Sequence, residues 1–365
     1  MHILILGNGF DLAHDLKTSY KDFLDYCYKC VNSISSEVDE KYKLGYERNL
    51  WLKHFITKNN SLGNNWIDLE NEIFEVIKKL STTYLIKNKY KHVQRIFVSF
   101  YASNFCFDNL GKYVHSTEDE SEFASYEYKE FYKNQCIEVY INSPKGLANF
   151  LFQQLREFTK LFESYLRERV LSQIMTPSNY HLSLKTIGVT KNSPNVFVLS
   201  FNYTNTCERI YNSKFKEYCS LNIKPVYVHG KVCDEENCNL VFGTKTFDEK
   251  EDIPLCFNIF QKHNQRHVLG TIDAYQDLLE KLSNVNIKPI FHIVGHSLDE
   301  TDKNILKHVL KMNKRAKIRI YYHKPEVQDR LINNITKIIG EEDTMTKVRL
   351  IEQHNLQTGI LIPIR

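Results

Sequence analysis

The first twelve residues constrain the fold more than any other part of the chain. An apolar run from His2 to Leu6 leads directly into the turn sequence Gly7-Asn8-Gly9. In doubly wound α/β proteins, a buried strand that ends in a glycine pair brings the backbone close to the phosphates of a nucleotide. The opening of the chain therefore predicts a nucleotide-handling α/β fold.

The composition excludes several other classes of protein. With 365 residues, 42% of them hydrophobic and 25% charged, the chain has the profile of a globular protein. The net charge of +4 is small and spread along the chain, so we do not expect a nucleic-acid partner. No apolar run approaches the roughly 20 residues that a membrane-spanning helix needs, so we do not expect membrane association.

The cysteines indicate in which cellular compartment the protein resides rather than a metal site. Nine scattered cysteines without a secretion signal are typical of reduced thiols, which predicts a cytoplasmic protein. Cys27 and Cys30 have zinc-knuckle spacing, and Cys233 and Cys238 follow later. Structural zinc needs four converging ligands. We therefore favour plain thiols over zinc and expect no metal.

The hydrophobic patterning divides the chain into two parts. Residues 19–185 are mostly helical in pattern, most clearly from 146 to about 174, where apolar residues recur at three- to four-residue steps. Shorter helices are predicted at 19–31, 51–55 and 66–80, and a surface loop or weak helix at 117–132.

Strand patterns return after this block. We predict strands at 195–201, 225–228, 240–242, 290–294 and 317–322, and helices at 302–312 and 326–339. Strands that alternate with helices indicate a parallel sheet with right-handed crossovers. We therefore expect an α/β fold in which residues 1–18 and 186–365 form a Rossmann-like nucleotide-binding domain. Residues 19–185 would form a large helical subdomain inserted after the first strand.

Four polar motifs directly follow predicted strands. They are Gly7-Asn8-Gly9-Phe10-Asp11, Phe201-Asn202-Tyr203-Thr204, His229-Gly230 and Gly295-His296-Ser297-Leu298-Asp299. Ligands of open α/β sheets bind at the carboxyl ends of the strands. We therefore expect the four motifs to converge on one site.

Each motif also has a purely structural interpretation. The glycine pair either forms a tight turn or contacts a phosphate or ribose, and Asp11 either caps a helix or binds a ribose hydroxyl. Asn202 either helps to cap the next helix, where Asn205 and Glu208 have capping-box spacing, or orients a ligand through its amide. His229 is either a satisfied buried histidine or an acid–base group.

The last motif has the same ambiguity. Ser297 and Asp299 either begin the helix that follows or contact a ligand, and Gly295 either permits the turn or makes room for that ligand.

Taken together, the motifs resemble those of the bacteriophage abortive infection AbiH family. The resemblance rests on six segments, in order along nearly the whole chain: 7–11, 16–23, 66–70, 201–204, 228–230 and 295–299. It implies an antiviral defence protein that acts by abortive infection.

More distantly, the glycine motif, Asn202, the His229-Gly230 pair and Ser297 are similar to the sirtuin-like NAD-binding fold. This similarity implies that Asn202 and His229 are catalytic and that Gly7, Asn8, Gly9 and Ser297 line a dinucleotide. We add their motif neighbours as candidate nucleotide-binding residues: Phe10, Asp11, Thr204, Gly295 and Asp299. A sirtuin zinc ribbon and an acyl-lysine groove are not recognisable in the sequence, which disfavours deacetylation.

The resemblance leads us to expect an NAD glycohydrolase that cleaves NAD, its substrate, to nicotinamide and ADP-ribose. One alternative is a non-catalytic sensor that binds NAD or a related nucleotide, and a less favoured one is a nuclease. A homo-oligomer or a partner from a defence system is compatible with the resemblance, but the sequence does not specify either.

Overall fold

The computed structural model describes the chain except residues 33–38, 63–66, 83–92, 100–101, 103, 118–124, 176–179, 183–195, 220–223, 233–238, 284–287, 355–359 and 364–365. The chain divides into two compact units. Unit 1 comprises Met1–Ser19, Tyr165–Val241 and Arg266–Arg365, and unit 2 comprises Tyr20–Ser164 and Phe242–Gln265. The predicted domain junction at 185–186 and the residues Trp66, Cys233 and Cys238 lie outside the described residues.

Unit 1 is built on a six-stranded sheet in which every pair of neighbours is parallel. Its strands are β1 (His2–Leu6), β7 (Val196–Ser200), β8 (Val226–Tyr227), β9 (Ile290–Val294), β10 (Lys317–Tyr322) and β11 (Val348–Glu352). Their order is β11-β10-β9-β1-β7-β8. The chain therefore moves outward from β1 to β8, crosses back, and moves outward in the other direction from β9 to β11.

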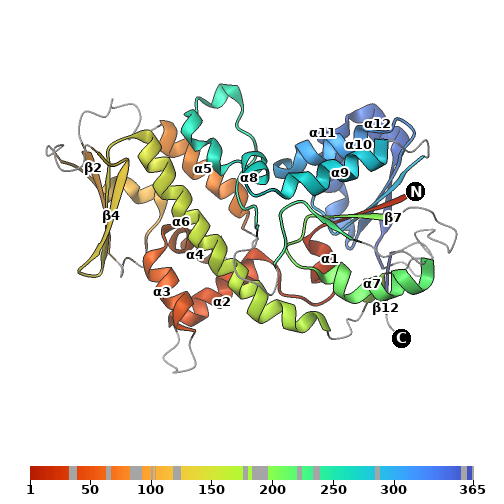
Figure 1. Cartoon of the computed structure of the whole chain (residues 1–365), viewed down its shortest axis with the longest axis horizontal. Helices are drawn as coiled ribbons and strands as arrows, with labels where there is room; N and C mark the ends of the chain where they lie inside the picture. The colour runs from red at the N-terminus through yellow and green to blue at the C-terminus, as the bar shows by residue number, and fades with distance from the viewer. Residues whose placement is uncertain are drawn as a thin grey trace. The chain divides into compact units, whose positions relative to one another are not determined.

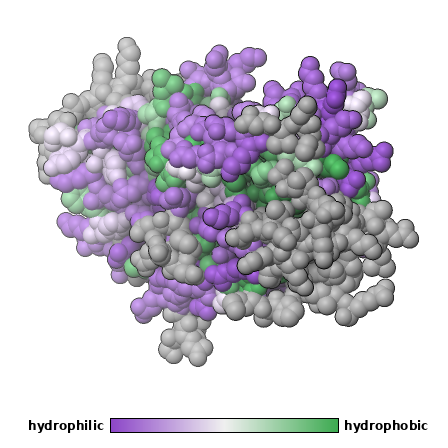
Figure 2. Space-filling view, turned by 45° about the vertical axis from the view of Figure 1, so that its right-hand side comes forward, coloured by the Kyte–Doolittle hydropathy of each residue, from purple (hydrophilic) through white to green (hydrophobic). Residues whose placement is uncertain are grey.

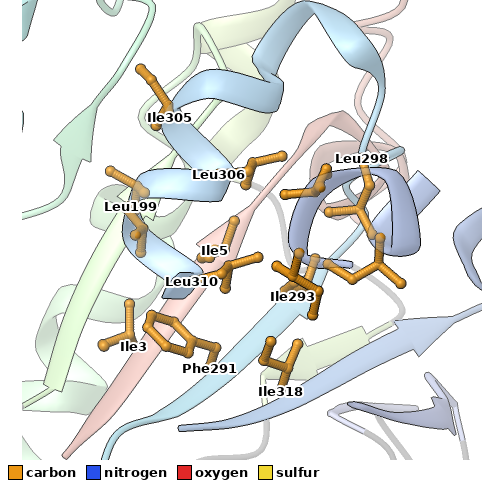
Figure 3. Close-up of a cluster of buried hydrophobic side chains, with 14 of the residues drawn as sticks. Ile3, Ile5, Leu199, Phe291, Ile293, Leu298, Ile305, Leu306, Leu310 and Ile318 are labelled. Atoms are coloured by element: carbon orange, nitrogen blue, oxygen red, sulfur yellow. The ribbon is translucent and has the colours of Figure 1, made fainter. Parts of the chain in front are cut away.

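Helices cover both faces of this sheet (Figure 1). On one face, α9 (Thr271–Ser283), α10 (Lys303–Lys311) and α11 (Gln328–Ile339) pack on strand side chains. Figure 3 shows Ile5, Leu199 and Ile293 gathered with the α10 residues Leu306 and Leu310.

On the other face, residues of α1 (Asn8–Leu12) and α7 (Thr206–Cys219) pack on Leu4 and Leu6. Burial on both faces explains why the sequences of the central strands are nearly unbroken apolar runs.

Unit 2 combines helices with an antiparallel sheet. The helices are α2 (Tyr20–Asn32), α3 (Glu40–Arg48), α4 (Leu50–Leu62), α5 (Leu69–Thr82) and most of α6 (Pro144–Tyr165). The sheet has the order β3-β2-β5-β4, with β2 at Val93–Ser99, β3 at Val114–Thr117, β4 at Tyr128–Lys133 and β5 at Cys136–Ile141. The sequence predicted a helical subdomain here and did not predict this four-stranded sheet.

Two further predictions need correction. The predicted loop or weak helix at 117–132 includes most of β4, an edge strand with no fully buried position and hence no clear alternation of apolar and polar residues. The predicted strand at 240–242 is buried but has irregular backbone, because the Phe242 amide donates to the side chain of Gln265 rather than to a neighbouring strand.

Several smaller elements complete the chain. Helix α6 is followed by a π-helical turn at Leu166–Val170 and a 3₁₀ turn at Leu171–Met175, where the sequence predicted a continuous helix. Strands β6 (Tyr180–Leu182) and β12 (Leu361–Pro363) form a two-stranded antiparallel sheet. Helices α8 (Lys262–Val268) and α12 (Glu341–Lys347) are short, and further 3₁₀ turns lie at Phe107–Lys112, Glu249–Glu251, Leu255–Phe260, Glu300–Asp302 and Pro325–Val327.

Most of the described residues on the face drawn in Figure 2 are hydrophilic. In Figure 2, hydrophobic residues appear in patches interrupted by hydrophilic ones. None of the described helices has the length and apolar character that would let it cross a bilayer.

Three polar side chains lie side by side on the sheet of unit 1. Nδ1 of His2 lies 3.2 Å from Nε2 of His292, whose Nδ1 lies 3.0 Å from the hydroxyl of Tyr321. Burial is the main cause that lowers the pKa of His292 to about 3 and that of His2 to about 4, and Arg319 lowers both further. Both imidazoles are therefore neutral in the folded protein at neutral pH.

This arrangement predicts acid-sensitive stability. Between about pH 6.5 and pH 4 the unfolded chain binds protons that the folded His292 excludes, so the free energy of unfolding falls as the pH falls through this window. We expect His292→Gln to reduce that dependence by an amount on the order of a few kcal/mol. Denaturant unfolding of both proteins between pH 7 and pH 4 measures this, and an unchanged pH dependence would contradict the assignment.

Candidate site at the carboxyl edge of the parallel sheet

The four motifs occupy neighbouring positions along one edge of the unit 1 sheet. Strands β9, β1, β7 and β8 are consecutive and parallel, and they are followed by Gly295, Gly7, Phe201 and Val228, respectively. The chain adds β7 and β8 on one side of β1, then crosses back and adds β9, β10 and β11 on the other side. The strand order therefore reverses between β1 and β9. The candidate site therefore lies at the carboxyl ends of four strands within one compact unit.

The glycines of two motifs pack against each other. Gly7 donates its amide to Val294 O at 3.0 Å, and Gly9 donates to Gly295 O at 2.8 Å. Gly295 has φ +64°, and a Cβ placed on it would lie 2.2 Å from the amide nitrogen of Phe10. The structure thus favours the tight-turn interpretation of the glycine pair, because both glycine amides already have partners inside the protein.

Asp11 is a buried carboxylate rather than a helix cap. It lies inside α1, whose N-cap residue is Gly7. Its Oδ2 accepts a hydrogen bond from the hydroxyl of Thr204, while its Oδ1 has no hydrogen-bond partner among the described residues. Burial raises the pKa of Asp11 to about 6, although hydrogen bonds from Thr204, Thr206 and Asn202 oppose the rise. Asp11 therefore titrates close to neutral pH.

Asn202 presents a second buried acceptor. Its side chain is 5% exposed, its amide group hydrogen-bonds to Asp11, and its Oδ1 has no partner among the described residues. The predicted capping box does not form: Asn205 Oδ1 is also without a described partner, and Glu208 accepts from Tyr227 and Lys231 instead. Buried polar atoms without partners are rare in proteins and are often explained by a ligand or a water molecule.

His229 belongs to a buried charged cluster. Its Nε2 lies 3.0 Å from Oδ1 of Asp302, and the same oxygen lies 3.1 Å from Arg266 Nη2. Arg266 Nη2 also lies 3.5 Å from His229 Nδ1. Because a guanidinium can only donate, Nδ1 acts as the acceptor from Arg266, and the proton of a neutral imidazole lies on Nε2, which faces the Asp302 carboxylate without an aligned hydrogen bond.

Asp302 and Arg266 were missed by the sequence analysis. Asp302 is 8% exposed at the end of a 3₁₀ turn, and Arg266 is 3% exposed in α8. A buried charge is costly unless it is paired. Within the sequence, however, neither residue differs from the polar residues of an ordinary surface helix.

The last motif forms a strained turn beside this cluster. Leu298 is buried with φ +59°, and its amide donates to His296 Nδ1 at 2.9 Å. Asn334 of α11 donates to the Ser297 carbonyl at 3.0 Å and to Asp299 Oδ1 at 3.2 Å. Asp299 precedes a 3₁₀ turn but its side chain makes no capping bond.

The site thus contains two polar groups. Asp11, Asn202 and Thr204 form the first, and His229, Asp302, Arg266 and His296 form the second. The ring of Phe201 packs against the second group, with ring centroids 5.5 Å from that of His229 and 4.4 Å from that of His296. Asn8 is exposed and accepts a hydrogen bond from Thr18 at 2.6 Å.

The buried oxygens of Asp11 and Asn202 can accept hydrogen bonds from a ligand. Asp11 and His229 are side chains of the types that transfer protons. In the part of the chain that the structure describes, no three His, Cys, Asp or Glu residues are grouped so that they could hold a metal ion.

Because Asp11 is buried, its negative charge lowers the free energy of unfolding, and a neutral side chain at this position should raise it. Its folded pKa of about 6 exceeds its unfolded value of 3.8, so the free energy of unfolding falls as the pH rises from about 4 to 6 and stays reduced above that. We expect Asp11→Asn to remove this fall and to raise stability at pH 7 by up to about 3 kcal/mol. Denaturant unfolding at pH 4 and pH 7 tests this; a variant less stable than wild type at both values would contradict it.

Comparisons with known proteins agree with the sequence motifs. The family model described as "Bacteriophage abortive infection AbiH" matches residues 3–323, which is most of the chain. Neither the search of curated proteins nor the search of solved structures returned a match.

Proposed function

Since this chain belongs to the bacteriophage abortive infection AbiH family, we propose that it acts in phage defence by binding NAD at the carboxyl edge of the unit 1 sheet and hydrolysing it. The observation that carries the proposal is the pair of buried oxygens, Asp11 Oδ1 and Asn202 Oδ1, that have no partner among the described residues. Both are acceptors at a position where open α/β sheets bind ligands.

The strand order supports a dinucleotide as the ligand. Numbered along the chain, the six strands lie in the order third, second, first, fourth, fifth and sixth. This is the order of the Rossmann fold, in which a dinucleotide binds where the strand order reverses. In this chain the reversal lies between β1 and β9, between the motifs that begin at Gly7 and Gly295.

The buried acceptors indicate which part of NAD would lie deepest. Oxygen acceptors pair with donors, so Asp11 and Asn202 suit ribose hydroxyls, the carboxamide of nicotinamide or a water molecule. They do not suit a phosphate, which is itself an acceptor. Because the Gly7 and Gly9 amides have internal partners, the pyrophosphate would contact more exposed groups, for which we propose Asn8 and Ser297.

Hydrolysis requires water to replace nicotinamide at the anomeric carbon of the ribose. The glycosidic C–N bond breaks and its electron pair leaves with nicotinamide, which neutralises the pyridinium ring. The ribose carbon passes through an oxocarbenium-like state, as in glycosidases. Asn202 Oδ1 would hold the water or the ribose hydroxyl, and the proton lost by water would go to His229 Nδ1, with Asp302 orienting the imidazole.

One observation favours a second candidate, a nucleotide sensor without turnover. Both nitrogens of His229 already face charged protein groups, Nε2 at Asp302 and Nδ1 at Arg266. For catalysis, the Arg266 guanidinium has to move away from His229 Nδ1, or stay beside it and still let Nδ1 accept the proton of the attacking water. A sensor needs no such movement, so the two functions differ in whether bound NAD is consumed.

Turnover of NAD by the purified full-length chain tests the proposal. We expect wild type, with extract of phage-infected cells as activator, to release nicotinamide. We expect Asn202→Ala and His229→Ala each to lower the rate by about 10² or more, the scale of acid–base and positioning contributions. His308→Ala, which changes an exposed histidine of α10, is the matched control and should keep the wild-type rate.

Calorimetric titration with NAD separates the remaining outcomes. Saturable binding without nicotinamide release would replace hydrolysis by the sensor function. Absence of binding, or full activity of His229→Ala, would refute the proposed site.

A further inference from the structure

The antiparallel sheet of unit 2 has one buried, apolar face and an opposite face that carries aromatic and basic side chains. Ile96, Val98, Ile137, Val139 and Ile141 are buried and make the inner face. The alternate residues of β2, β3, β4 and β5 point the other way, and among them Val93 and Cys136 are buried. We call the following residues the outer face: Arg95, Phe97, His115, Lys129, Phe131, Lys133, Glu138 and Tyr140.

The strand register places these residues in two rows. Phe97, Glu138 and Phe131 are cross-strand partners on β2, β5 and β4. Arg95, Tyr140 and Lys129 are partners in the next row, and His115 of β3 pairs with Arg95. Three aromatic rings from three strands therefore alternate with basic side chains on one surface.

Two of the three aromatic rings are exposed, and the third, that of Tyr140, is half-buried. Phe97 and Phe131 are each 37% exposed, which is unusual for phenylalanine. The rings of Phe131 and Tyr140 have centroids 5.9 Å apart at 89°, so they form an edge-to-face pair rather than a closed stack. The Lys129 ammonium lies 4.9 Å from the Phe131 ring centroid.

The charge of the outer face is positive. Arg95, Lys129 and Lys133 carry three positive charges against the single carboxylate of Glu138. Glu138 lies in the middle of the aromatic row, where it accepts a hydrogen bond from the Tyr140 hydroxyl at 3.3 Å. Positive groups around exposed rings are complementary to a chain of phosphates with stackable bases.

We propose that the outer face of this sheet binds single-stranded RNA. Four-stranded sheets with exposed aromatic residues on neighbouring strands can stack two or three unpaired bases. On this face Phe97, Tyr140 and Phe131 would stack bases, and the basic residues would contact phosphates. The Glu138 carboxylate would accept a hydrogen bond from a ribose 2′-hydroxyl, which DNA lacks.

This site is independent of the proposed NAD chemistry. All of its residues belong to unit 2, and the proposed NAD residues belong to unit 1. It also modifies the expectation drawn from net charge, because a local basic surface can bind nucleic acid when the whole chain is nearly neutral.

Fluorescence anisotropy with a short labelled polyuridine tests the proposal. We expect saturable binding by the full chain at low salt, with log affinity falling linearly with log salt at a slope of about −0.7 for each phosphate contacted. Phe97→Ala and Phe131→Ala should each weaken binding by about tenfold. Phe131→Trp should retain affinity, since it preserves a ring for stacking.

Two controls isolate the surface. Tyr28→Ala removes another exposed aromatic residue, from α2, and should bind as wild type. Lys129→Gln changes only a half-buried surface charge and should reduce the salt slope, so it reports on the site even if a phenylalanine variant unfolds.

Three results would overturn the proposal. They are absence of saturable binding by wild type, unchanged affinity in a folded Phe97→Ala, Phe131→Ala double variant, and equal affinity for polydeoxythymidine of the same length. None of these results depends on NAD turnover. Failure of the RNA proposal would therefore leave the NAD proposal intact, and failure of the NAD proposal would leave the RNA proposal intact.

Discussion

The close approach of two turns, one after β1 and one after β9, determines the geometry of the candidate site. Gly9 and Gly295 share a hydrogen bond of 2.8 Å, and no side chain fits between them. This contact fixes the two strands at which the sheet order reverses. Asp11 and His296 follow these turns directly, so their positions relative to each other depend on glycine at both places.

Around this contact the protein retains a buried polar group and a strained backbone turn, both of which lower its stability. Asp11 is buried with one oxygen lacking a described partner, and Leu298 has φ +59° in a buried turn. Proteins retain such features mainly where function requires them. The buried pair of Asp302 and Arg266 next to His229 fits the same interpretation, because it orders an imidazole at the expense of desolvating two charges.

The sequence predicted those parts of the structure that depend on local pattern. Buried central strands such as β7 and β9 are apolar throughout, and the polar residues after them mark the strand ends. Strand β11 was missed because charged residues interrupt the run Val348–Glu352 at the sheet edge. Asp302 was missed because its partners, Arg266 and His229, come from distant segments, and the pairing follows from the fold rather than from any local signal.

The crossover between β8 and β9 has a consequence for biosynthesis. Asp11 leaves the ribosome nearly 300 residues before Asp302. Contacts between such remote segments form slowly, since a long loop must close before they yield stabilisation. A nascent polypeptide that ends before Asp302 therefore lacks one half of the His229–Asp302 pair, and the site becomes complete only after that residue has been added.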